Sequence, residues 1–234
     1  ALVGEKIAIV TNKPQTTRNR ICAIVDRGDT QLVFIDTPGF HRPRTKLGDY
    51  MVNVVNQSVA DVDAVILLVE PIANVGPQEQ ELIEKIREAK VPAILVINKI
   101  DTVKDEEIIA KAIDTYKNVC PFAEIVPVSA LRNQNTDKMT ELLFQYLPYG
   151  PQYYDEDTVT DQPMRQIAAE LIREKALRMM SDEIPHGIAV TIERMTERDN
   201  GIFDIDATII CERESHKGIV IGKGGQMLKR IGTS

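Results

Sequence analysis

An acid at the end of an apolar run is the first sign of chemistry in this chain. Residues 32–35 read Leu-Val-Phe-Ile, and Asp36-Thr37-Pro38-Gly39 follows. Apolar runs bounded by Pro and Gly are typical of strands in a covered sheet, and ligands bind outside the carboxyl ends of such strands. Asp36 can therefore hold Mg²⁺, and the Gly39 amide, with no Cβ beside it, can approach a phosphate closely. Asp-x-x-Gly alone also fits an ordinary strand-to-loop turn.

Two further polar segments follow apolar runs later in the chain. Asn98-Lys99-Ile100-Asp101 comes after the run 93–97, and Ser129-Ala130-Leu131 comes after the run 125–128. The Asp101 carboxylate can accept hydrogen bonds from guanine N1–H and the 2-amino group, donors that adenine lacks. A buried carboxylate left unpaired costs about 1–3 kcal/mol, so adenine is rejected by roughly tenfold or more. These segments predict a guanine site, although Asn-Lys-x-Asp also suits a turn or a helix N-terminus.

Other residues of these segments have predicted roles of their own. Asn98 can tie its loop to the neighbouring loop and meet the base, and the Lys99 stem can lie along the face of the base. The Ala130 amide can donate to guanine O6. The adjacent hydroxyls of Thr16 and Thr17, in an early polar loop, can bond Mg²⁺ or phosphate, although a plain surface loop is the alternative interpretation.

Composition limits the classes of function. The chain has 234 residues, of which 43% are hydrophobic and 27% charged, which suits one or two soluble domains with real cores. No apolar stretch approaches the roughly 20 residues that cross a bilayer, so we expect a cytoplasmic protein. Three scattered cysteines support neither a disulfide framework nor a zinc site. The net charge of −7 argues against polyanion binding by the whole molecule, so such binding requires a local basic patch.

Strand-like and helical patterns alternate through the first half of the chain. We expect strands at 20–26, 30–36, 63–69, 93–97 and 125–128, and helices at 46–60, 77–89, 105–119 and 139–147. Residues 27–29 predict a hairpin between the first two strands, which would be one antiparallel pair within the sheet. Ala1–Gly4 has the pattern of a helix end closed by Gly. The continuous apolar runs predict an α/β fold with a mostly parallel sheet and helices on both faces.

The second half has a different order of elements. Residues 149–162 are acidic and lack a helical period, which is typical of a linker. A helix is expected from Pro163 to near residue 184, followed by strands at 187–197 and 203–212 around an Asn-Gly hairpin turn. Two short helical pieces then flank a Gly-x-x-Gly turn, with Ile219, Ile221, Leu228 and Ile231 as expected buried anchors.

The Gly-x-x-Gly turn lies in a basic segment. No acid occurs from residue 215 to residue 234. Glycines let a nucleic-acid backbone approach, and neighbouring cations neutralise its phosphates, although a turn with solvated lysines is the alternative. The predicted RNA contacts are Lys217, Gly222, Lys223, Gly224, Gly225, Lys229 and Arg230.

These motifs together resemble a known family. Pro-Gln-Thr-Thr-Arg at 14–18 and Asp-Thr-Pro-Gly-Phe at 36–40 resemble the Era family of translation-factor-class GTPases, and the second half resembles a type II KH domain. The resemblance implies a Ras-like P-loop GTPase domain at 1–148, a linker at 149–162 and an α+β KH domain at 163–234. It makes Thr16 or Thr17 the switch I magnesium ligand, and Asp36 and Gly39 the switch II contacts. The implied nucleotide-binding residues are Asp36, Thr37, Pro38, Gly39, Asn98, Lys99, Asp101, Ser129, Ala130 and Leu131.

The resemblance also implies a function. It is a Mg²⁺-dependent switch that hydrolyses GTP to GDP and phosphate and binds 16S-type ribosomal RNA near its 3′ end through the KH domain. Its partners would be GTP, GDP and the 30S subunit, whose assembly it would assist as a monomer. The family's association with the membrane surface stays open for this chain. The alternative is a non-hydrolysing RNA-binding protein that uses a GTPase fold as a scaffold.

The chain departs from the family pattern in three respects. Phe40 follows Gly39 where many small GTPases have a water-orienting Gln, so we expect slow intrinsic hydrolysis. No Gly-x-x-x-x-Gly-Lys-Ser/Thr loop occurs in residues 1–234, and the resemblance puts that loop just before Ala1–Gly4. The last strand of a type II KH domain is likewise not found. We therefore expect these residues alone to recognise guanine but to bind its phosphates poorly.

Overall fold

The computed structural model describes residues 2–11, 16–17, 20–38, 62–180 and 187–234. Contacts divide the chain into two units, which are described separately. Unit 1 contains residues 1–5 and 23–159, and unit 2 contains residues 6–22 and 160–234. The early segment 6–22 thus groups with the second half of the chain. The domain limits at 148 and 163 stay a prediction.

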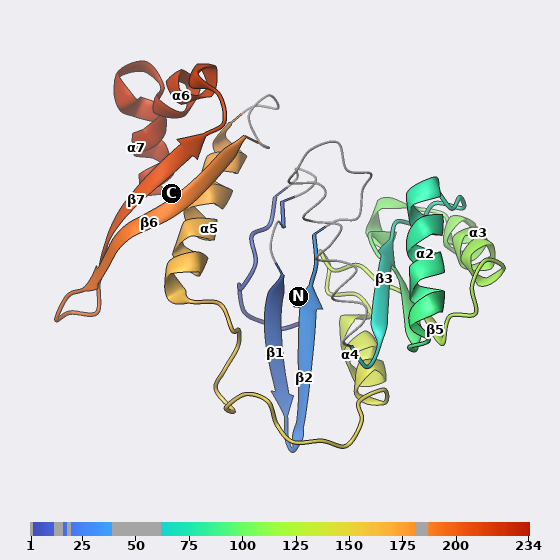
Figure 1. The fold of residues 1–234 in the computed structure, drawn as a ribbon. Helices are drawn as coiled ribbons and strands as arrows, with labels where there is room; N and C mark the ends of the chain where they lie inside the picture. The colour runs from blue at the N-terminus through green and yellow to red at the C-terminus, as the bar shows by residue number, and fades with distance from the viewer. Residues whose placement is uncertain (1, 12–15, 18–19, 39–61, 181–186) are drawn as a thin grey trace. The chain divides into compact units, whose positions relative to one another are not determined.

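A parallel sheet forms the centre of unit 1. It consists of β3 (Val65–Val69), β4 (Ala93–Ile97) and β5 (Glu124–Pro127), with β4 in the middle; Figure 1 labels β3 and β5. Leu95 of β4 lies opposite Leu67 on one side and Ile125 on the other. All five side chains of β4 are buried, because both faces of the sheet are covered.

Three helices cover this sheet, at bounds close to those predicted. They are α2 (Pro77–Ala89), α3 (Glu106–Lys117) and α4 (Thr136–Phe144). Ile83 and Ile86 of α2 and Tyr116 of α3 pack in one cluster with alternate residues of β4. Met139 and Leu143 of α4 pack in a second cluster with the other residues of β4. The two clusters contain opposite faces of β4, so the predicted helices on both faces are confirmed.

Local signals explain where α2 and α3 begin. Pro77 occupies the first turn of α2, where its missing N–H costs nothing, and the Gly76 amide donates to Glu79 Oε2 at 2.7 Å. The Asp105 carboxylate accepts from the Glu107 amide at 2.9 Å and caps α3. Burial, together with the nearby Glu79 carboxylate, raises the pKa of Tyr116, so this core tyrosine stays neutral.

The first two strands form the predicted hairpin. β1 (Ile21–Arg27) and β2 (Thr30–Asp36) pair with each other across a two-residue turn. In the part of the chain that the structure describes, the hairpin forms a two-stranded sheet of its own, so its expected place within the parallel sheet is not observed there. Packing nevertheless joins β2 to the core of unit 1, because Leu32 lies in the cluster of Ile94 and Val96.

Two other predicted helical segments, at residues 1–4 and at residues 46–60, had different outcomes. Residues 2–4 are not helical, and Gly4 has φ +81°. The helix predicted at 46–60 lies outside the described residues.

Unit 2 has the predicted element order. It contains α5 (Met164–Met179), β6 (Ile188–Glu197), β7 (Phe203–Cys211), α6 (Glu214–Ile221) and α7 (Gln226–Thr233). β6 and β7 are antiparallel, and the Gly201 amide donates to Arg198 O at 2.9 Å in their turn. Neither α5 nor another helix of the described residues has the length and apolar character needed to cross a bilayer.

The buried anchors of α6 and α7 differ in part from those predicted. Val220 and Ile231 are buried, whereas Ile219, Ile221 and Leu228 are 43%, 39% and 45% exposed. Successive residues of a helix point about 100° apart, so a short helix that buries Val220 turns both its neighbours toward solvent. Three of the four expected anchors were therefore wrong, and only Ile231 is confirmed.

The Gly-x-x-Gly turn between α6 and α7 requires glycine at one position above all. Gly222 has φ +72° and ψ 176°, a conformation essentially restricted to glycine. A Cβ at this position would lie 2.7 Å from Met227 Cβ and 2.9 Å from its amide nitrogen. Gly224 has φ +56° and ψ 28°, in the left-handed region, with open space around a Cβ.

We expect Gly222→Ala to destabilise the protein far more than Gly224→Ala. Strain and overlap at residue 222 should remove about 3 kcal/mol or more of the free energy of unfolding, against about 1 kcal/mol at residue 224. Chemical denaturation followed by circular dichroism measures both. Equal losses in the two variants would contradict the contact with Met227.

Candidate guanine-nucleotide and RNA site

The carboxyl ends of β4 and β5 hold the two predicted base-reading loops side by side. The backbone amide of Asn98 donates to Val69 O at 2.8 Å, and the backbone amide of Val128 donates to Ile97 O at 2.8 Å. The Ile100 amide donates to Val128 O at 3.3 Å. Because these bonds continue the ladder past the strands, the positions of both loops follow from the register of the sheet.

Side-chain hydrogen bonds then join the two loops. Asn98 Oδ1 accepts from the Ala130 amide at 3.0 Å. The Ser129 hydroxyl, which is fully buried, donates to Asp101 Oδ1 and accepts from the Arg132 amide. The predicted tie between Asn98 and its neighbouring loop is thus present. One carboxylate oxygen of Asp101 is held in a fixed direction by a buried donor.

The Ala130 amide has a partner that its predicted role did not include. We expected this amide to donate to guanine O6, yet in the structure it donates to Asn98 Oδ1. A contact with O6 therefore requires the amide to share or exchange that bond. Leu131, the last residue of the predicted segment, is largely exposed.

Lys99 pairs with an acid that sequence reasoning missed. Its ammonium group donates to Glu70 Oε1, and its backbone is left-handed, with φ +65°. The Thr102 hydroxyl donates to Lys99 O at 2.7 Å and closes the turn. Glu70 directly follows β3, as Asn98 follows β4, so its place at the same edge of the sheet was the available signal. The contact of the Lys99 stem with a base stays a prediction.

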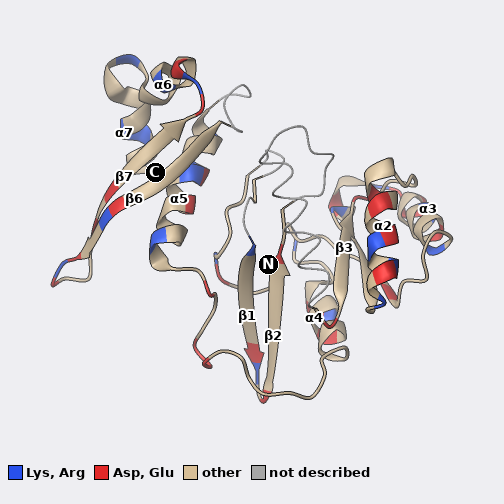
Figure 2. Cartoon of the chain, in the orientation of Figure 1, with Lys and Arg blue, Asp and Glu red and all other residues tan. Residues whose placement is uncertain are grey.

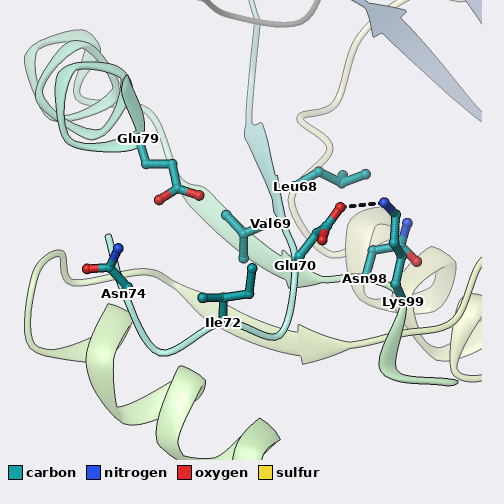
Figure 3. Close-up of a pocket in the computed structure, with 8 residues that line it drawn as sticks. All are labelled: Leu68, Val69, Glu70, Ile72, Asn74, Glu79, Asn98 and Lys99. Carbon is teal, nitrogen blue, oxygen red and sulfur yellow. Dashed lines mark hydrogen bonds and ion pairs between the residues drawn. The ribbon is translucent and has the colours of Figure 1, made fainter. Parts of the chain in front are cut away.

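A hollow of about 510 Å³ adjoins the loop of Asn98 and Lys99 in unit 1 (Figure 3). Glu70, Asn98 and Lys99 line it on one side, and the apolar side chains of Leu68 and Ile72 contribute to its wall. Asp101 is not among its lining residues. The hollow therefore borders one of the predicted base-reading loops without containing the carboxylate predicted to select guanine.

The predicted metal and phosphate contacts fall in separate parts of the chain. Asp36 is the exposed last residue of β2 in unit 1, followed by Thr37 and the buried Pro38. Thr16 and Thr17 group with unit 2. Gly39 and Phe40 lie outside the described residues. No cluster of three or more His, Cys, Asp or Glu suited to a metal occurs among the residues that the structure describes.

The predicted RNA contacts gather at the Gly-x-x-Gly turn of unit 2. Lys217, Lys223, Lys229 and Arg230 are all exposed, and Figure 2 shows the basic residues of α7 in blue. Lys217 Nζ lies 3.4 Å from Glu214 Oε1. The exposed Ile219, Ile221 and Leu228 lie in the two helices that flank the turn. Sequence reasoning placed these three in the core and so missed their exposure to solvent.

Comparison with known proteins decides the family. Residues 1–99 match the family described as 50S ribosome-binding GTPase, and residues 183–234 match the KH domain. The GTPase Era of Clostridium kluyveri is 48% identical over 233 residues, which cover 100% of this chain and 79% of that protein. The chain belongs to the Era family of GTPases. The Era of Ruminiclostridium cellulolyticum is 46% identical, with 100% of this chain and 78% of that protein covered.

Solved Era structures share the fold. A crystal structure of Era in complex with MgGDPNP and nucleotides 1506–1542 of 16S ribosomal RNA matches with TM-score 0.94 and 36% identity, over 99% of this chain and 79% of that one. An Aquifex aeolicus Era variant bound to GDP·AlF4⁻ matches equally well, with TM-score 0.94 and 36% identity over 99% and 79% of the two chains. The predicted Ras-like GTPase fold followed by a KH domain is confirmed.

Asp101→Asn should shift base preference from guanine toward xanthine. The Asn side chain presents an N–H donor to the 2-amino group of guanine, which is also a donor, so affinity for GDP should fall about tenfold or more. The 2-oxo group of xanthine can instead accept from the same N–H and so gains a partner. Competition between GDP and xanthosine diphosphate for a fluorescent nucleotide measures this. Asp114→Asn, the same change on the exposed face of α3, serves as the control. An unchanged preference in Asp101→Asn would remove this residue from the base site.

Proposed function

We propose that the protein is a guanine-nucleotide switch that hydrolyses GTP and binds 16S-type ribosomal RNA near its 3′ end through its KH domain. The observation that carries the nucleotide part is the pair of interlocked loops at the ends of β4 and β5. Their Ser129–Asp101 and Asn98–Ala130 bonds orient the polar groups that guanine requires. The RNA part is supported by the Era structure that holds MgGDPNP and nucleotides 1506–1542 of 16S ribosomal RNA.

The discrimination between bases follows from the charge of Asp101. Its carboxylate can accept from N1–H and the 2-amino group of guanine, while adenine presents no donor at those positions. The Ser129 bond keeps the carboxylate in one orientation, so little rotamer entropy is lost on binding. Asn98 accepts from the Ala130 amide and so ties the neighbouring loop to the loop that carries Asp101.

The reaction is in-line attack of water on the γ-phosphate. Asp36 offers a carboxylate oxygen, a donor that Mg²⁺ prefers, so it fits as a protein ligand, and the family resemblance adds the hydroxyl of Thr16 or Thr17. Mg²⁺ supplies positive charge to the phosphate oxygens when it is bound. Phe40 has no polar group to orient the attacking water, so intrinsic hydrolysis should be slow and depend on a partner.

RNA binding is assigned to the turn between α6 and α7. Gly224 and Gly225 leave room for a phosphate backbone, and Lys223, Lys229 and Arg230 bring positive charge to it. Because the whole chain has a net charge of −7, this attraction must be local and strongly dependent on salt.

Further properties stay part of the proposal. They are assistance to 30S subunit assembly, a monomeric state, a cytoplasmic location and peripheral association with a membrane surface. A non-hydrolysing RNA-binding scaffold is the alternative function. The buried Ser129 donor on Asp101 favours the switch, because a scaffold has no need of an oriented base-selecting carboxylate.

Replacing Lys223 and Gly224 together with Asp should abolish RNA binding. Two carboxylates in the turn repel the phosphates, and the left-handed backbone at residue 224 tolerates Asp. We expect an affinity loss of at least about tenfold for an RNA of nucleotides 1506–1542 of 16S ribosomal RNA, and a shallower dependence on salt. Fluorescence anisotropy across a salt series measures both.

Lys111→Asp on the exposed face of α3 is the matched control, and it should leave RNA affinity unchanged. GDP binding should be retained in the double variant, which shows that the fold is intact. If the double variant binds the RNA as tightly as the wild type, the RNA surface lies elsewhere.

A further inference from the structure

The loop that follows β5 is closed by hydrogen bonds between its two ends. Ser129 and Gln134 form an antiparallel bridge, in which the Ser129 amide donates to Gln134 O at 3.1 Å and the Gln134 amide donates to Ser129 O at 3.0 Å. One residue further on, the side chain of Asn135 reaches back to β5, and its Nδ2 donates to Pro127 O at 2.9 Å. Asn135 thus joins the exit of the loop to the strand from which the loop starts.

Asn135 does not follow the usual pattern of a residue that precedes a helix. It stands directly before α4, yet its side chain does not cap that helix. Its backbone is left-handed, with φ +60° and ψ 11°, whereas an ordinary N-cap residue is extended. The chain therefore lacks a stabilising cap here and adopts a conformation that is unfavourable for most L-residues. What this arrangement provides instead is the bond to Pro127 O.

Asn133 offers a comparison within the same loop. Its backbone is also left-handed, with φ +52°, and its main-chain oxygen accepts from the Thr136 hydroxyl at 3.3 Å. Asn133 is exposed, and among the described residues its side chain makes no hydrogen bond. The two asparagines therefore share a backbone conformation and differ in the side-chain bond, so Asn133 is a matched control for Asn135.

The position of Ser129, the first residue of this loop, depends on how the loop is held. At the entry, the Val128 amide donates to Ile97 O at 2.8 Å and fixes the chain to β4. At the exit, Asn135 fixes it to the end of β5. Between these two points the buried Ser129 hydroxyl donates to Asp101 Oδ1. Such a bond weakens steeply with distance and angle, so a loop held at one end alone would lose it.

We propose that Asn135 is a positioning residue for the recognition of guanine. By closing the loop onto Pro127, it holds the Ser129 hydroxyl against Asp101 and so fixes the carboxylate that selects the base. This inference rests on the proposed function. A binding group that a second hydrogen bond holds in one orientation discriminates between ligands more sharply than a group that is free to rotate. Asn135 therefore contributes to base selectivity through Ser129.

The test compares base selectivity in two glycine variants. Glycine adopts the left-handed conformation freely, so Asn135→Gly and Asn133→Gly should both fold, and only the first loses a side-chain bond. The measured quantity is the ratio of the affinities for GDP and ADP, because both nucleotides carry the same diphosphate and its contribution cancels. The ratio should fall at least about fivefold in Asn135→Gly and keep its wild-type value in Asn133→Gly. Competition against a fluorescent nucleotide measures it.

A second substitution tests the hydrogen bond itself. Asn135→Asp keeps the shape of the side chain but replaces the donor with a carboxylate oxygen, which Pro127 O repels, so selectivity should fall at least as far as in Asn135→Gly. A general loss of folded protein lowers both affinities by the same factor and leaves their ratio unchanged. A wild-type ratio in Asn135→Gly therefore overturns the inference. A wild type that does not prefer GDP to ADP instead refutes the proposed function itself.

Discussion

The proposed nucleotide site depends on the parallel pairing of β4 with β3 and β5. Five consecutive buried side chains fix β4 between two helical layers, and its register with β5 brings Asn98 and Asp101 beside Ser129 and Ala130. Among the described residues, neither a disulfide nor a metal cluster contributes to this placing of the two loops. A shift of one residue would turn each apolar side chain to the opposite face and would separate the two loops. The arrangement of the predicted base-reading loops therefore rests on the hydrophobic packing of β4.

Much of this fold could be predicted from local sequence signals. The bounds of α2 and β4 were predicted to the residue, because Pro77 marks the helix start and Ala93–Ile97 is a continuous apolar run. The places of the two loops at the ends of β4 and β5 were also predicted, since Asn98 directly follows β4 and Ser129 comes two residues after β5, whereas their contact with a base stays a prediction. Motifs of this kind are visible because the residues that do the chemistry lie close together in the sequence.

The remaining features depend on contacts between distant residues, which no local pattern reports. Lys99 pairs with Glu70, and Glu174 pairs with Lys6 across 168 positions of sequence. The exposure of Ile219 and Ile221 likewise depends on which face α6 turns to the core of unit 2. An isolated apolar residue in a short helix fits either face, so its burial is settled only by packing. The two units also differ in the charged groups that they bury, because unit 2 buries a carboxylate beside the cations that neutralise it.

The most direct test of the account is the affinity of the wild-type protein for a series of nucleoside diphosphates. Inosine diphosphate keeps N1–H and O6 of guanine but lacks the 2-amino group, and ADP lacks both donors. If the Asp101 carboxylate reads the base, GDP binds most tightly, inosine diphosphate about tenfold more weakly, and ADP at least a further tenfold more weakly, roughly one lost hydrogen bond per step. Equal affinities for GDP and inosine diphosphate, or comparable binding of ADP, would contradict the assignment of the base-reading loops.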